Sequence, residues 1–391
     1  MRFEGALGKL NQSYFFREFT FSTNTFRPDK RTELELADAV VWLDDFLIVV
    51  QVKERYAAFG ATSTDEENWF NSEVLGKAAT QIGNTLRYLH SYDSIEVANN
   101  QGHAFNLADA KDKRTHKLII YRPNEKLPEI CASQKFHENA TAGVIHIIRS
   151  DDYLGVLQTL ITPAEVEQYL SFREELIKRW RNVVSQVTEQ ALVGQFLRNV
   201  LDQRPSSQFI EWLAALQQRA ADTQKWDISR IIHLFAERRN TPQKSPTDYY
   251  GILKELAKLN RTDMDAFKTR FFYSMKMADA DNIVLPNRFV ASTGCGFVFI
   301  PLQRARMGDR HHALEAFTQL NKYDLQLQRC VGLTFVSEGD ETWCDVQWCR
   351  LDYPWKENAK FAAALKENYP FRPVKTAVVE RYGLLTPERN E

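Results

Sequence analysis

The stretch Glu35–Arg55, ELADAVVWLDDFLIVVQVKER, decides the fold of the first part of the chain. Within it, Ala37–Leu43 is rich in apolar and β-branched residues, and Phe46–Val50 is an unbroken apolar run. Only the polar pair Asp44-Asp45 separates the two runs. Apolar runs on either side of a short polar break are typical of a two-stranded hairpin that is buried on both faces. We therefore predict a buried hairpin here.

Polar side chains gather at the open end of this hairpin. If the turn has two residues, Asp38 faces Gln51 on the same face of the sheet. Lys53 follows Gln51 by two residues and shares that face. A three-residue loop would move Asp38 to the other face. The predicted patch holds a carboxylate, a carboxamide and an ammonium group, which are costly to bury without partners. A solvated hairpin end is the alternative, in which an Asp–Lys pair contributes little to stability.

The order Asp38, then Gln51-Val52-Lys53, resembles the core motif of the PD-(D/E)XK nuclease superfamily. The D…Q-x-K pattern, with Gln in place of the usual acid, is similar to that of the Mrr-like restriction branch. The resemblance covers residues 1–181, where Phe3-Glu4 and Arg17-Glu18-Phe19 also match. It implies a restriction-endonuclease-like domain, with a central mixed sheet flanked by helices.

The resemblance also implies a site that cleaves phosphodiester bonds with Mg²⁺ (or Mn²⁺). Asp38, the amide oxygen of Gln51 and the backbone carbonyl of Val52 would bind the metal. Lys53 would orient the attacking water or stabilise charge on the phosphate. Because Gln51 is neutral, the site needs another acid or is slow or inactive. Glu4, at the start of a helix predicted over residues 2–13, is the first candidate for that acid.

Other residues have two interpretations each. Glu18, in a segment (Tyr14–Phe21) that alternates like a strand, is a second candidate acid or a solvent-facing residue. Thr64-x-x-Glu67 predicts the start of a long helix that ends near His90. On that helix Lys77 and Gln81 are one turn apart. They match the placement of DNA-binding residues in related nucleases, or they are an ordinary exposed pair.

The sequence as a whole predicts three domains. Residues 1–181 form the nuclease-like α/β domain, and residues 182–280 form a helical middle region. Residues 281–391 form an α+β domain to which the sequence assigns no role. Neither His311-His312 nor the Cys344…Cys349 spacing favours a metal site there.

Composition limits the class of protein. The 391 residues are 44% hydrophobic and 26% charged, as in ordinary globular proteins. A net charge of −1 provides no overall basic field, so nucleic acid would bind through local patches. The five Cys are odd in number and widely spread, which fits a reducing compartment. No stretch has the pattern of a signal peptide or a membrane span, so we expect a cytoplasmic protein.

Two functions are therefore open. The first is a metal-dependent endodeoxyribonuclease that acts on DNA in bacterial defence, as a homodimer or with a partner subunit. The second is a catalytically inactive nucleic-acid-binding, scaffold or regulatory subunit on the same fold, in which Asp38 and Lys53 form a structural ion pair.

Overall fold

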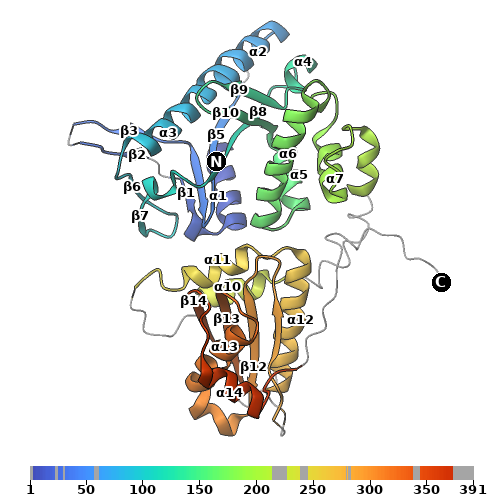
Figure 1. Cartoon of the computed structure of the whole chain (residues 1–391). Helices are drawn as coiled ribbons and strands as arrows, with labels where there is room; N and C mark the ends of the chain where they lie inside the picture. The colour runs from blue at the N-terminus through green and yellow to red at the C-terminus, as the bar shows by residue number, and fades with distance from the viewer. Residues whose placement is uncertain are drawn as a thin grey trace, which may run out of the picture. The chain divides into compact units, whose positions relative to one another are not determined.

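The computed structural model describes residues 3–22, 25–29, 31–56, 61–213, 227–237, 245–278, 280, 283–337 and 344–372. The chain divides into two compact units, Met1–Gln218 and Arg219–Glu391 (Figure 1). Both units combine sheets with packed helices, so the predicted α/β class is confirmed at this level.

The first unit is built on a six-stranded mixed sheet with the order β1-β4-β5-β8-β10-β9. β5, β8 and β10 run parallel, and the remaining neighbours pair antiparallel. The strands are β1 (Thr20–Phe21), β4 (Ala39–Leu43), β5 (Phe46–Glu54), β8 (Arg114–Arg122), β9 (Phe136–Asn139) and β10 (Gly143–Arg149). Two small ribbons accompany it: β2 (Thr25–Phe26) with β3 (Leu34–Glu35), and β6 (Glu96–Ala98) with β7 (Ala104–Asn106).

The predicted hairpin is confirmed, and so is its register. β4 and β5 pair with Leu43 opposite Phe46 and Val40 opposite Val49. The turn is therefore Asp44-Asp45, with Asp44 in the left-handed region at φ 54°. Aspartate tolerates that conformation better than most residues. β5 also pairs with β8, which places the hairpin inside the sheet.

Helices cover both faces of this sheet (Figure 1). One face packs against a continuous helical run, because Leu47 and Val49 share a core with Phe70 and Ile82. The run consists of α2 (Ser63–Trp69), the π-helix η2 (Phe70–Ala78) and α3 (Ala79–Ser91). The other helices are α1 (Phe3–Phe15), α4 (Glu129–Ala132), α5 (Ser150–Thr159), α6 (Pro163–Val184) and α7 (Glu189–Arg198), with short 3₁₀ turns η1 (Arg17–Phe19), η3 (Leu107–Ala110) and η4 (Ser207–Phe209).

Two local predictions in this unit are wrong. The helix after the hairpin begins at Ser63, because Thr62 and Asp65 form the capping box that we placed at Thr64. The segment Tyr14–Phe21 is not one strand, because α1 continues to Phe15 and a 3₁₀ turn follows before β1. Apolar residues are buried here both at the helical spacing (Phe15 and Phe19) and at the strand spacing (Phe19 and Phe21). Alternation alone therefore did not distinguish a helix from a strand.

The second unit is a four-stranded sheet with the order β11-β12-β13-β14 and helices on both faces. Phe297 and Phe299 face the core shared with α12, while Val298 and Ile300 face the core shared with α13. The strands are β11 (Asn287–Val290), β12 (Gly296–Leu302), β13 (Arg329–Ser337) and β14 (Cys344–Asp352). The helices are α10 (Ser229–Glu237), α11 (Tyr250–Ala257), α12 (Arg261–Met277), α13 (Arg310–Asp324), α14 (Ala359–Glu367) and the 3₁₀ turn η6 (Arg304–Asp309).

The predicted helical region 182–280 does not form a unit of its own. α7 packs against α5 and α6 in the first unit. α12 packs against β11 and β12 in the second unit. An amphipathic helix buries its apolar stripe against whichever sheet is available, so its own sequence does not show which domain it joins. None of the helices in the described ranges combines the length and the hydropathy that crossing a membrane requires.

Candidate functional site

Asp38 is fixed at the open end of the hairpin by a hydrogen bond to β5. The backbone N–H of Val52 donates to Oδ2 of Asp38 over 2.6 Å. The ladder between β4 and β5 ends at the pair Ala39–Val50, and the chain bends at Asp38. If β4 continued past Ala39, a backbone carbonyl of that strand would accept a hydrogen bond from the N–H of Val52. The Asp38 carboxylate accepts this hydrogen bond instead. This places the acid of the predicted motif directly on the strand that carries its Gln and Lys.

The backbone of Val52 contributes a second oxygen on this side of the strand. In an extended strand the N–H and C=O of one residue point to the same side. Since the N–H of Val52 points to Asp38, its carbonyl does too. The geometry is therefore compatible with the prediction that the Asp38 carboxylate and the Val52 carbonyl bind the same metal ion.

Lys53 is held by a residue of α3. Its Nζ donates to Oε1 of Gln81 over 2.8 Å. The positive charge of Lys53 also favours the ionised form of Asp38, so the two side chains share one electrostatic environment. The predicted neighbours Asp38, Lys53 and Gln81 are thus brought together from a bend, a strand and a helix.

Lys77 does not join them. It lies in the π-helix η2, is exposed, and forms an ion pair with Glu73 at 3.5 Å. The prediction placed Lys77 and Gln81 one turn apart on a regular α-helix. The two residues instead belong to different helical forms, η2 and α3, and their side chains have different partners.

Gln51 lies within the core of the sheet. Its side chain is 0% exposed. Among the described residues, neither its amide oxygen nor its amide nitrogen has a hydrogen-bond partner. An unpaired buried amide costs about 1–3 kcal/mol. Such a cost is expected where a polar group is retained for a ligand rather than for stability.

The ionisation of Asp38 is suppressed in the folded protein. Burial raises the pKa of Asp38 to about 6, although the Val52 N–H and Lys53 act in the opposite direction. The charges of Glu4 and Glu35 raise this pKa further. A bound cation would reverse these effects, because it would compensate the buried negative charge.

The candidate acids are placed differently by the fold. Glu4, at the start of α1, and Glu35, at the end of β3, are exposed and act on Asp38 through their charge. We did not predict Glu35, although it stands three residues before Asp38. Glu18 lies elsewhere: since Thr20 pairs with Val41, Glu18 is displaced toward the turn end of β4. The structure therefore separates Glu18 from the site.

The oxygen donors suit a hard divalent cation. Asp38 offers a carboxylate, Val52 a backbone carbonyl and Gln51 an amide oxygen that has no other described partner. Carboxylate, carbonyl and amide oxygens are the ligands that Mg²⁺ and Mn²⁺ take. The residues present thus fit the predicted metal by donor type.

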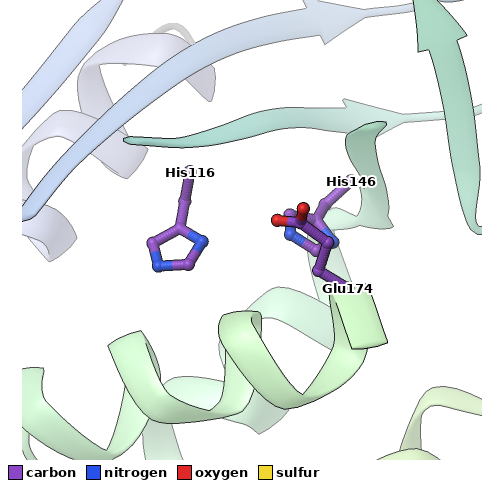
Figure 2. A group of neighbouring side chains, drawn as sticks. All are labelled: His116, His146 and Glu174. Atoms are coloured by element: carbon purple, nitrogen blue, oxygen red, sulfur yellow. The ribbon is translucent and has the colours of Figure 1, made fainter. Parts of the chain in front are cut away.

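A second polar cluster was not predicted from sequence. In the described part of the chain, His116, His146 and Glu174 have potential ligand atoms within 4.8 Å of one another (Figure 2). His146 interrupts the apolar run GVIHII, and that interruption was the available signal. His116 lies in the polar segment THK directly before the apolar run LII, where nothing marked it. His311-His312 and Cys344…Cys349 do not appear in any such group of described residues.

Comparison with known proteins finds no match: no family model, no curated protein and no solved structure is similar to this chain.

Proposed function

We propose that the chain is a metal-dependent nuclease that cleaves phosphodiester bonds in DNA, with Asp38, Gln51, Val52 and Lys53 as its site. The observation that carries the proposal is the Asp38–Val52 hydrogen bond beside Lys53. It supports a carboxylate and an ammonium group held at the end of one strand, which is the arrangement that the D…Q-x-K resemblance implies. The helix α1 before the hairpin and the α2–α3 run after it agree with the implied restriction-endonuclease-like layout.

The chemistry divides among a few groups. Asp38 would hold Mg²⁺ or Mn²⁺ with the Val52 carbonyl and the Gln51 amide oxygen. A bound metal supplies charge stabilisation at the scissile phosphate and a more acidic water. Lys53 would orient that water or stabilise charge on the phosphate oxygens. Gln81 is a positioning residue, because it holds Nζ of Lys53.

The alternative is a catalytically inactive nucleic-acid-binding or scaffold subunit on the same fold. Two observations favour it: Gln51 is neutral, and Glu4 and Glu35 are exposed rather than bonded to Asp38. Hard cations bind more weakly where fewer charged oxygens surround them. In that case Asp38 and Lys53 stabilise the end of the hairpin and no cleavage occurs.

The test is DNA cleavage by purified protein with matched variants. Supercoiled plasmid and linear phage DNA are incubated in Mg²⁺ or Mn²⁺ with wild type, Asp38→Asn, Lys53→Met and Asp45→Asn. Asp45 is an exposed carboxylate at the other end of the same hairpin, so its variant controls for charge. We expect nicking by wild type and Asp45→Asn, and at least a hundredfold slower nicking by the other two. Equal rates in all four proteins, or no metal-dependent cleavage by wild type, would refute the nuclease proposal.

A further inference from the structure

A polar cluster lies on the α6 side of the central sheet (Figure 2). His116 comes from β8 and His146 from the parallel strand β10, while Glu174 comes from α6. His116 is 2% exposed and His146 is 0% exposed. Glu174 is partly exposed and pairs with Lys178 at 3.0 Å. Gln51 belongs to the opposite face, so this cluster is independent of the proposed nuclease site.

The hydrogen-bond polarity of His146 is set by Arg173. A guanidinium NH1 of Arg173 lies 2.9 Å from Nδ1 of His146. Arg173 is itself fixed, because it donates to both carboxylate oxygens of Glu189 and to the carbonyl of Ile147. A guanidinium has no acceptor atom, so Nδ1 of His146 must accept. Burial, with the charge of Arg173, lowers the pKa of His146 well below its usual value. The ring is therefore neutral and carries its proton on Nε2.

The polarity of His116 is set by Glu167. Nε2 of His116 lies 3.3 Å from Oε1 of Glu167. Burial opposes ionisation of Glu167, but hydrogen bonds from His116 and Arg114 keep its pKa below the usual value. An ionised carboxylate only accepts, so Nε2 of His116 must donate. In the neutral ring Nδ1 of His116 then carries the lone pair.

The two rings thus offer opposite groups to one space. Among the described residues, neither Nδ1 of His116 nor Nε2 of His146 has a hydrogen-bond partner. His116 presents a lone pair, His146 presents an N–H, and Glu174 adds an accepting carboxylate. Buried polar groups of this kind are normally satisfied by protein or by an ordered water.

A metal ion does not fit this polarity. A histidine that binds a metal donates its other ring N–H to a carboxylate or carbonyl. His116 has that arrangement with Glu167, but His146 has the reverse one with Arg173. A metal on Nε2 of His146 would require an imidazolate ring. The spacing of the ligand atoms, within 4.8 Å of one another, does not distinguish a metal ion from a water molecule. Zinc holds its ligands about 3.4 Å apart, and water holds its hydrogen-bond partners about 4.6 Å apart.

We propose that His116, His146 and Glu174 form a binding site for one buried water molecule and not for a metal ion. The water accepts from Nε2–H of His146 and donates to Nδ1 of His116 and to the carboxylate of Glu174. Two donors and one acceptor in the ligand match two acceptors and one donor in the protein. A small alcohol has one hydroxyl proton and would leave one acceptor unsatisfied.

The first test is the tautomer of each ring in the full chain. Long-range ¹H–¹⁵N spectra of ¹⁵N-histidine-labelled protein at pH 8 distinguish Nε2–H from Nδ1–H rings. His116→Gln and His146→Gln assign the two signals, each by the loss of one. We expect both rings to carry the proton on Nε2. A proton on Nδ1 of His146 would overturn the proposal.

The second test looks for the ligand in the wild-type protein and so does not depend on the folding of a variant. A crystal structure should show one density peak within about 3.2 Å of all three side chains. A soak or titration with Co²⁺ should give no visible absorption band from this cluster. A cluster without the peak, or a Co²⁺ band that His116→Gln removes, would overturn the proposal.

Discussion

The backbone N–H of Val52 donates a 2.6 Å hydrogen bond to Oδ2 of Asp38, so a carboxylate from the first strand segment is fixed on the second strand. The same contact fails to keep Asp38 acidic, because burial raises the pKa to about 6. Asp38 is therefore held in place at a cost in stability whenever it is ionised. A buried carboxylate with a raised pKa marks a candidate functional site.

Replacing Asp38 by Asn should stabilise the fold at high pH. The native state keeps the Asp38 proton up to about pH 6, whereas the unfolded chain releases it near 3.8. The native state thus binds more protons between these values, and the free energy of unfolding of wild type falls as pH rises through that window. The loss is at most about 3 kcal/mol. Asn avoids it and can still accept from Val52.

Urea unfolding at pH 4 and pH 8 measures this effect. We expect Asp38→Asn to exceed wild type by about 1–3 kcal/mol at pH 8 and to match it at pH 4. Asp45→Asn serves as the control, because Asp45 is exposed. A variant less stable than wild type at pH 8 would show that the ionised Asp38 contributes to stability through its electrostatic attraction to Lys53.

Metal binding should depend on the ionisation of Asp38. A cation competes with the proton for this carboxylate, so affinity should fall about tenfold per pH unit below pH 6. Thermal unfolding of wild type with Mn²⁺ at pH 8 should show a concentration-dependent rise in Tm. The rise should disappear in Asp38→Asn. An equal rise in both proteins would place the Mn²⁺ elsewhere.

The hairpin could be predicted because its determinants are local. The two-residue turn and the alternation of side chains fixed which residues of Glu35–Arg55 lie opposite one another. Asp38 still differs from the prediction in detail, since its carboxylate bonds to the backbone of Val52 and does not simply face Gln51.

Other features depend on contacts between distant segments. Lys77 lies in the π-helix η2 and pairs with Glu73, whereas Gln81 lies in α3 and accepts from Lys53, and no residue pattern in Phe70–Ala78 signalled the π-helix. Glu18 was misplaced because the register of β1 on β4 is set by pairing, not by its own sequence. The polarity of His146 depends on Arg173, which is 27 residues later in the chain.

Removing the side chain that holds Lys53 should slow cleavage without weakening DNA binding. Gln81→Ala leaves Nζ of Lys53 without its 2.8 Å partner, so the ammonium group would sample other positions. We expect about a tenfold lower kcat with an unchanged KM. Lys77→Ala is the helix control, because Lys77 is exposed and forms an ion pair with Glu73. A change in KM for Gln81→Ala would instead assign Gln81 to substrate binding.

Replacing Gln51 by Glu tests whether the neutral amide limits the site. The variant places a carboxylate at a position that is 0% exposed. Without metal, a buried carboxylate is costly, so the Tm of the variant should fall and the pKa of Asp38 should rise further. With Mn²⁺, a second charged oxygen should strengthen binding at least tenfold, as measured by calorimetry at pH 8.

Gln51→Leu is the matched control, since it removes the unpaired amide and should raise stability while weakening Mn²⁺ binding. If Gln51→Glu loses stability and gains no affinity, the amide of Gln51 does not contact the metal, and Asp38 must bind it with Val52 and water alone.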